Sequence, residues 1–352
     1  MQDIIERRGG ERGRVPAISV VMPVHNGLPF LDASIESILN QTFRDFEFII
    51  LDDASTDGTK ERLREWAGRD ERIRLFESGE KLDLSSLLNL CVRQARGPLI
   101  ARMDADDISH KDRLMRQWKI IESRTDVALV GTLFEGIDTR GRRVRRRDRW
   151  RLARKNVFPP FPHGSVMFRR DIFDELGGYR QECDLWEDQE LFLRIRKRAS
   201  IVVLTDVLYY YRFHVGNATT SRSIERIAHA YSMRRQYLEE LRRGRDNMRP
   251  LKEAVLNGHD GSCPHPEAIA YALYITGSMR LWAGQPPDVT SLLFEHKAFG
   301  LNAFQLRTLI WATWGWLSPA SLRFFLRSFL RTRDFLAGYS VKDGGIHEWR
   351  IE

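Results

Sequence analysis

Apolar strand-like runs alternate with amphipathic helical segments across the first 130 residues. The runs span residues 18–24, 46–51, 73–76, 99–103 and 127–130. Between the first two, apolar side chains recur at the spacing of one helical face, at Leu31, Ile35, Ile38 and Leu39. Alternation of this kind predicts an α/β fold, in which helices flank a mostly parallel central sheet.

Polar side chains follow three of these runs at the point where each run ends. His25 and Asn26 follow the first run, Asp52 and Asp53 the second, and residues 104–107 (DADD) the fourth. The carboxyl ends of parallel strands lie at one edge of a sheet, where ligands bind. We therefore expect the three groups to converge on one crevice.

The segment DADD holds three carboxylates, Asp104, Asp106 and Asp107, within four residues. Like charges this close together are unfavourable unless a cation lies between them. Carboxylate oxygens suit Mg²⁺ or Mn²⁺, and such ions usually share their coordination with substrate phosphates. The alternative is helix capping, in which Asp106 or Asp107 caps a helix predicted to begin near His110.

The pattern changes after residue 130. Glu187 and Asp188 precede an apolar helical face, so these acids are predicted to lie at a helix N-terminus. Residues 201–204 and 207–213 are predicted to form two strands, and His214 closes the second. The last part of the chain, residues 221–352, is predicted to be a largely helical region.

Positive charge is concentrated in one segment. The chain has a net charge of +8, and residues 140–155 hold ten Lys or Arg against one acid, so the remainder is nearly neutral. This distribution argues against a uniformly basic nucleic-acid-binding protein, and we expect no nucleic-acid partner. Three widely separated cysteines without a CxxC pair favour a reducing compartment and a cytoplasmic location. Residues 1–16 lack an apolar core and are predicted to be a loose leader.

Five segments together resemble a known family. They are VVMPVHN (20–26), QTFRDFEFIILDDASTDGT (41–59), ARGPLIARMDADD (95–107), WEDQELFLR (186–194) and YYYRFH (209–214). In this order and spacing they are similar to the inverting family-2 glycosyltransferases with a GT-A fold. The resemblance covers about residues 17–220. It implies a GT-A catalytic domain with a Rossmann-like nucleotide-sugar half (17–125) and an acceptor half (126–220).

The resemblance implies a nucleotide-sugar donor, and a UDP-sugar is the expected one. Pro23, His25 and Asn26 would line the pocket for the base, with His25 stacked on a uracil-like ring. Asp53 would accept a hydrogen bond from the base, and Asp52 would orient the loop or the ribose. The loop at residues 81–85 lacks the glycine that many members carry there, so donor contacts from this loop are not implied.

The DADD segment matches the DxD motif of the family. By this match Asp106 is the metal ligand, and Asp104 faces either the ribose or the metal. His214 is a candidate third ligand, although a rim residue near the phosphates or a plain surface histidine is an equal alternative. The implied cofactor is Mn²⁺ or Mg²⁺, which would neutralise the charge of the leaving diphosphate.

Asp188 matches the catalytic base of the family. An acceptor hydroxyl is a poor nucleophile and needs a carboxylate within hydrogen-bond reach. Attack from the face opposite the nucleotide inverts the anomeric centre. Taken alone, Glu187 and Asp188 favour helix capping, and it is the other motifs that favour Asp188 as the base. His163, Trp186 and Glu187 are assigned to the acceptor side.

The C-terminal region contains a tryptophan-rich uncharged run, residues 308–322, which is too short to span a bilayer. A basic amphipathic helix with tryptophans can lie in a membrane interface, or it can pack on the catalytic domain or on another subunit of an oligomer. Together with the basic run 140–155, it predicts peripheral association with an anionic membrane surface.

The expected function is therefore metal-dependent, inverting hexosyl transfer to a glycan or lipid-linked acceptor in surface polysaccharide synthesis. Two alternatives remain at this point. A nucleotidyltransferase would use similar carboxylates but would usually carry a glycine-rich, basic phosphate loop, which PVHNG (residues 23–27) is not. A non-catalytic adaptor would bind anionic surfaces through the basic run and would tolerate the loss of Asp106 and Asp188.

Overall fold

The computed structural model describes residues 4–8, 14–143, 161–183, 185–214, 216–217 and 346–348. The chain forms two compact units. The first comprises residues 1–137, 143–212 and 338–352, and the second comprises residues 138–142 and 213–337. All the site residues predicted from the sequence belong to the first unit, except His214, which belongs to the second.

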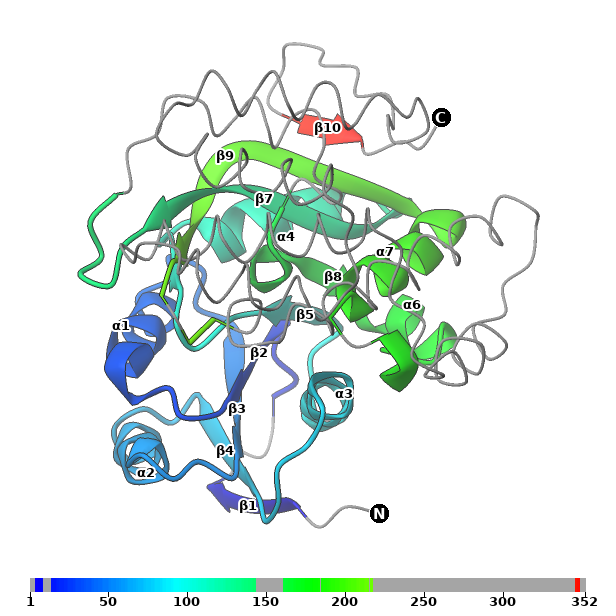
Figure 1. Ribbon diagram of the computed structural model, residues 1–352. Coiled ribbons are helices and arrows are strands. Elements are labelled where there is room, and N and C mark those ends of the chain that lie inside the picture. The colour runs from blue at the N-terminus through cyan, green and yellow to red at the C-terminus, as the bar shows by residue number, and fades with distance from the viewer. Residues whose placement is uncertain are drawn as a thin grey trace, which may run out of the picture. The chain divides into compact units, whose positions relative to one another are not determined.

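The first unit is built on one sheet, which has ten strands among the described residues (Figure 1). The strands are β1 (Ile4–Arg8), β2 (Ile18–Val24), β3 (Phe46–Asp53), β4 (Ile73–Ser78), β5 (Leu99–Arg102), β6 (Ile108–Ser109), β7 (Val127–Ile137), β8 (Met167–Arg169), β9 (Ser200–Arg212) and β10 (Ile346–Glu348). Their order is β1-β4-β3-β2-β5-β8-β7-β9-β10, with β6 paired to β9.

Strands β4, β3, β2 and β5 run parallel to one another, as do β7 and β9. Strand β8 is inserted antiparallel between β5 and β7. The reversed β8 therefore joins a first parallel group, which ends at β5, to a second group that begins at β7. The predicted α/β class with a mostly parallel central sheet is confirmed.

Helices flank this sheet on both faces. They are α1 (Leu28–Leu39), α2 (Thr59–Arg69), α3 (Leu84–Gln94), α4 (Arg113–Ser123), α6 (Arg170–Glu175) and α7 (Glu187–Arg198), with short 3-10 turns η1 (His163–Ser165) and η2 (Gln181–Cys183). Helix α3 packs against β2 and β3, and α4 packs against β7. Figure 1 shows α1 and α2 on the side of β2 and β3 opposite to α3.

The central strands are buried along their whole length. Every position of β2 and β3 is buried, which explains why these runs are apolar without alternation. Helix α1 buries the apolar stripe predicted for it, including Leu31, Ile35 and Ile38. Because β3 continues through Asp52 and Asp53, its burial also covers these two carboxylates at the carboxyl edge of the sheet.

Two expectations from the sequence are wrong. Residues 201–204 and 207–213 do not form two strands, because β9 continues through Thr205 and Asp206, and its pairing with β7 shifts register near this point. Neither Asp106 nor Asp107 caps a helix. Helix α4 begins only at Arg113, and the residue before it is Asp112.

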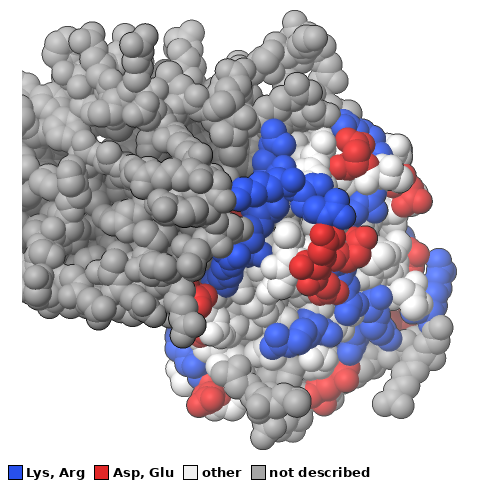
Figure 2. Space-filling model, turned by 90° about the vertical axis from the view of Figure 1, so that its right-hand side faces the viewer, with Lys and Arg blue, Asp and Glu red and all other residues white. Residues whose placement is uncertain are grey.

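Charges of both signs lie on the face shown in Figure 2, where a band of Lys and Arg adjoins a group of Asp and Glu.

Within the described part of the chain, no helix is long and apolar enough to cross a membrane. Residues 144–155 of the basic run lie outside the described residues, as does the helical region predicted over 221–352, apart from Ile346–Glu348, which forms β10.

Candidate functional site

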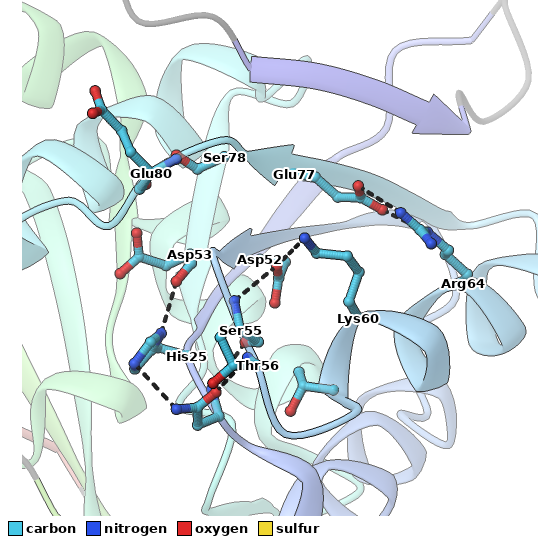
Figure 3. Close-up of polar contacts among 12 residues, drawn as sticks. His25, Asp52, Asp53, Ser55, Thr56, Lys60, Arg64, Glu77, Ser78 and Glu80 are labelled. Carbon is cyan, nitrogen blue, oxygen red and sulfur yellow. Dashed lines mark hydrogen bonds and ion pairs between the residues drawn. The ribbon is translucent and has the colours of Figure 1, made fainter.

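The loop after β2 is locked to the loop after β3 by side-chain hydrogen bonds (Figure 3). His25 Nδ1 lies 2.7 Å from the main-chain oxygen of Asp53. The amide of Asn26 donates to Ser55 Oγ at 2.9 Å, and Asn26 Oδ1 accepts from the amide of Thr56 at 2.9 Å. Asn26 has a φ of 50°, in the left-handed region that asparagine tolerates better than most residues. Both side chains remain exposed, so they can still meet a ligand.

Asp52 and Asp53 end β3 beside this loop, next to the buried Pro23 of β2. Asp52 Oδ2 accepts from the Ser55 amide at 3.2 Å, and Lys60 Nζ lies 4.0 Å from the same oxygen. Asp53 Oδ1 accepts from the Leu82 amide at 2.8 Å. Burial raises the pKa of Asp53, and the Leu82 hydrogen bond opposes that rise. Buried carboxyl groups at a strand end, with ordered loops around them, provide acceptors for the polar groups of a ligand.

The strand β5 leads directly into the acidic segment. Its last residue, Arg102, is buried, and Arg102 Nη1 lies 2.5 Å from Asp104 Oδ1. The side chain of Asp104 is 28% exposed and that of Arg102 only 4%. Burial raises the pKa of Asp104. The Arg102 guanidinium opposes this rise, whereas the charge of Asp106 adds to it.

Asp107 anchors the acidic segment to β9. Its Oδ1 accepts from the Arg212 amide at 2.7 Å, and Arg212 Nε donates to the main-chain oxygen of Asp106 at 2.7 Å. Its Oδ2 is buried and has no hydrogen-bond partner among the described residues. Burial, followed by the charges of Asp106 and Asp104, raises the pKa of Asp107 well above its ordinary value. A cation close to these oxygens would relieve both effects.

Gly164 of the turn η1 brings the second half of the chain against Asp104. Its carbonyl oxygen and that of Arg102 both accept from Arg113 Nη1, at 3.2 and 3.0 Å. A Cβ at this position would overlap Asp104 Oδ2 and the Tyr209 hydroxyl, and would lie 2.7 Å from Tyr209 Cζ. Glycine is therefore the residue that permits this close approach.

The acids Glu187 and Asp188 lie in the first turn of α7, as predicted, and Trp186 directly precedes the helix. Trp186 and Glu187 are buried and Asp188 is half-buried. The side chain of Trp186 makes no capping hydrogen bond. Asp188 Oδ1 accepts from the Gln189 amide at 2.7 Å, so this acid also satisfies one main-chain N–H of the first turn. Burial raises the pKa of Tyr179, and the charges of Glu187, Asp188 and Asp104 add to that rise.

His163 lies in the same buried region. Its Nε2 is 2.8 Å from the Tyr179 hydroxyl, and its Nδ1 is 3.7 Å from Glu187 Oε1. Burial, with the nearby Arg102 charge, lowers the pKa of His163 well below its ordinary value, so the imidazole is neutral. The structure thus places His163 beside Tyr179 and Glu187, and the adjacent Gly164 against Asp104, which pairs with Arg102. His214 belongs to the other unit.

The described residues contain no group of three or more His, Cys, Asp or Glu side chains that could by itself hold a metal ion. The donor set nevertheless fits a divalent cation that completes its coordination with phosphate oxygens, the usual mode for Mg²⁺. The supporting observations are the buried Asp107 Oδ2, which has no hydrogen-bond partner among the described residues, and the raised pKa values of Asp104 and Asp107, caused by burial and then by neighbouring carboxylate charges.

The sequence reasoning missed Arg102, Tyr179, Gly164 and Tyr209. Arg102 carried a usable signal, because a charged residue within an apolar run that ends in carboxylates predicts an internal ion pair. Tyr179 and Gly164 are contributed by turns with partners far along the chain, such as Asn89 for Tyr179 and Arg113 for Gly164, and nothing in their local sequence indicates those partners.

Known proteins are similar to the part of the chain that holds most of these residues. The family model described as Glycosyl transferase family 2 matches residues 19–177. The protein EpsE of Bacillus subtilis is 36% identical over 188 residues, which cover 51% of this chain and 66% of that protein. The O-antigen biosynthesis glycosyltransferase WbnJ of Escherichia coli is 32% identical over 216 residues, which cover 58% of this chain and 82% of that protein. The chain thus spans slightly less than two thirds of EpsE.

Two solved structures have a similar fold. The mannosyltransferase PcManGT of Pyrobaculum calidifontis, solved with GDP-Man and Mn²⁺, gives a TM-score of 0.52 at 20% identity and covers 94% of this chain and 91% of that one. Residues 1–349 of S. aureus TarS, solved with UDP-GlcNAc, give a TM-score of 0.53 at 17% identity, with 94% and 95% coverage. At these identities the likeness concerns the fold alone, and it confirms the predicted GT-A type.

Proposed function

Since the chain belongs to glycosyl transferase family 2, we propose that it transfers a sugar from a nucleotide-diphosphate donor to a hydroxyl group of an acceptor. The observation that carries this proposal is the turn η1, which contacts two acidic groups: Gly164 lies against Asp104, and His163 Nδ1 lies 3.7 Å from Glu187 Oε1. Asp104 follows a strand of the parallel sheet, and Asp188 is next to Glu187 in the first turn of α7. A donor site and a base opposite it are the two parts that such a reaction requires.

The nucleotide would bind at the carboxyl edge of β2 and β3. Pro23, His25 and Asn26 would line the pocket for the base, and Asp53 would accept from it. Asp52 is tied to the Ser55 amide and would orient the loop under the ribose. The interlocked loops support this assignment, because a site whose side chains are already ordered loses less entropy on binding.

Asp106 and Asp104 would hold Mn²⁺ or Mg²⁺ together with the donor diphosphate, and His214 is a candidate additional ligand. When bound, the ion would supply positive charge to the leaving diphosphate. The protein's own part is to keep the carboxylates in place. Arg102 restrains Asp104 from one side, and Arg212 holds the main chain of Asp106 from the other.

Asp188 would remove the proton from the acceptor hydroxyl as that oxygen attacks the anomeric carbon. The attacking oxygen then lies opposite the nucleotide, so the configuration at the anomeric carbon is inverted. Trp186, Glu187 and His163 would shape the acceptor side. Burial of Glu187, and the half-burial of Asp188, supports a division in which Asp188 is the carboxylate available to substrate.

The names of the relatives support a role in surface polysaccharide synthesis with a glycan or lipid-linked acceptor. WbnJ is named as an O-antigen biosynthesis glycosyltransferase. The TarS structure contains UDP-GlcNAc and the PcManGT structure GDP-Man, so UDP- and GDP-sugars are both donors to test for this chain, with the UDP-sugar expected. Peripheral contact with an anionic membrane surface, and a cytoplasmic location, complete the proposal.

Nucleotide release from UDP-GlcNAc, dTDP-glucose and GDP-mannose in the presence of Mn²⁺ tests this function, with water as the acceptor. We expect the wild-type protein to release the nucleotide from one donor class. Asp188→Asn should reduce turnover at least about a hundredfold, in the range given by loss of a general base, and should retain nucleotide binding. Wild-type turnover in Asp188→Asn would refute the assignment of the base. Absence of both binding and release with all three donors would favour the non-catalytic adaptor.

A further inference from the structure

The turn that follows α6 lies between α3 and α7. The Tyr179 amide donates to Asn89 Oδ1 at 2.9 Å, and Asn89 Nδ2 donates to the Tyr179 carbonyl oxygen at 2.8 Å. The Asn89 side chain of α3 therefore holds the main chain of Tyr179 by two hydrogen bonds. From the other side, Arg194 of α7 donates to the Gly178 carbonyl oxygen at 2.7 Å. Gly178 has a φ of +75°, and a Cβ there would lie 2.6 Å from Asn89 Oδ1. The main chain of Tyr179 is therefore fixed to the donor half.

The side chain of Tyr179 continues this connection toward α7. Its hydroxyl lies 2.8 Å from His163 Nε2, and His163 Nδ1 lies 3.7 Å from Glu187 Oε1 in the first turn of α7. When the proton is on Nδ1, it points to the Glu187 carboxylate, and Nε2 accepts from the Tyr179 hydroxyl. Tyr179 is 3% exposed and the His163 side chain 11%, so water competes little for these contacts. Burial also raises the pKa of Tyr179, so its phenol stays protonated.

We propose that Tyr179 and His163 are positioning residues, which hold the first turn of α7, and with it Asp188, at a fixed place relative to the donor half. This inference rests on the proposed glycosyl transfer, in which Asp188 is the base. Neither residue touches the reacting atoms in this account. Their effect on rate follows from geometry, because a misplacement of about 1 Å in a reacting group can reduce a rate about a hundredfold.

The same side chains also pack against aromatic neighbours. The His163 ring meets Phe192 edge-on with centroids 5.9 Å apart, and it lies 5.4 Å from the Tyr179 ring. A role in packing alone needs the rings but not their polar atoms. Phenylalanine at either position keeps a ring and removes the hydrogen bond, so this substitution separates positioning from packing.

The experiment compares Tyr179→Phe and His163→Phe with wild type in the nucleotide-release assay, using the donor that the wild-type protein hydrolyses among UDP-GlcNAc, dTDP-glucose and GDP-mannose. We expect kcat to fall at least tenfold, while the donor KM and the calorimetric Kd of the free nucleotide change less than twofold. In an Asp188→Asn background the same substitutions should cause no further loss, because the base they position is absent. Tyr210→Phe is the matched control and should behave as wild type, since no described hydrogen bond involves its hydroxyl.

Amide hydrogen exchange in the first turn of α7 tests the same inference without turnover. We expect faster exchange at residues 189–191 in Tyr179→Phe and in His163→Phe, and unchanged exchange in Tyr210→Phe. Unchanged exchange together with wild-type kcat in both variants would overturn the positioning role. If the wild-type protein released nucleotide from none of the donors, the proposed function would fail, while the exchange rates would still decide whether these residues hold α7.

Discussion

Replacing Gly164 by alanine tests whether the donor and acceptor segments meet as closely as the structure indicates. The added methyl group would overlap Asp104 Oδ2 and the Tyr209 hydroxyl, and would stand 2.7 Å from Tyr209 Cζ, inside the 3.0 Å that Cβ atoms keep from other heavy atoms. Tyr209 is fully buried and cannot swing into solvent, so the strain must displace Asp104 or the turn η1.

Overpacking of this kind costs about 1–3 kcal/mol in the free energy of unfolding. For a domain of this size that corresponds to a decrease in Tm of about 2–12 °C. Because the Asp104 carboxylate is one of the two displaced groups, calorimetry should also show weaker binding of the nucleotide with Mn²⁺. Differential scanning fluorimetry measures the first effect, and calorimetric titration the second.

Gly79→Ala is the matched control for stability, because a Cβ at Gly79 meets nothing within 4 Å. Its free energy of unfolding should differ from wild type by no more than about 0.5 kcal/mol, the range of a neutral surface substitution, so its Tm should change little. If Gly164→Ala had the Tm and the nucleotide affinity of the wild-type protein, η1 would not lie against Asp104, and the proposed junction between the two halves would be wrong.

Two further predictions concern the loops that would bind the nucleotide. Asp53→Asn keeps the acceptor for the Leu82 amide and removes a carboxyl group whose pKa is raised by burial. At pH values between the ordinary Asp pKa of about 3.9 and the raised pKa of Asp53, the folded wild-type protein binds more protons than the unfolded chain. The free energy of unfolding therefore falls as the pH rises through that window. Thermal melts should therefore show Asp53→Asn with a higher Tm than wild type at pH 8, and a difference that shrinks toward acidic pH, whereas equal Tm values at both pH values would contradict the burial argument. Asn26→Ala loses the bond from the Thr56 amide and places alanine at a φ of 50°, which should destabilise the fold by about 1–2 kcal/mol; an unchanged melting curve would show that this loop bears no such strain.

The parallel part of the sheet could be predicted because its strands are buried on both faces. Such strands are apolar at consecutive positions, and polar residues mark their carboxyl ends, such as Asp52 within the end of β3 and Asp104 after β5. The helical spacing in α1 was equally clear, since its buried positions repeat every three or four residues. Burial pattern and chain order together were sufficient to predict that the three polar groups share one edge of the sheet.

The continuity of β9, the start of α4 and the contact between Tyr179 and His163 could not be predicted in this way. The interruption at Thr205 and Asp206 suggested a turn, yet β9 passes through it, because its pairing with β7 can shift register without breaking. The N-terminus of α4 was also misplaced, because capping residues are abundant between Asp104 and Asp112 and local sequence does not choose among them. Tyr179 reaches His163 only through the tertiary fold, and local periodicity contains no information about that distance.

Calorimetric titration of UDP with and without Mn²⁺, on wild type and on Asp106→Ala, determines whether the carboxyl edge of the sheet binds a nucleotide through an ion that Asp106 holds. The proposed donor site predicts that Mn²⁺ strengthens UDP binding to the wild-type protein at least about tenfold, a difference of about 1.4 kcal/mol. It further predicts that Asp106→Ala abolishes this gain and keeps the Tm of wild type within a few degrees. If Mn²⁺ strengthened UDP binding equally in both proteins, Asp106 would not hold the ion. If UDP, dTDP and GDP all failed to bind the wild-type protein with Mn²⁺ present, the carboxyl edge of this sheet would not be a nucleotide site.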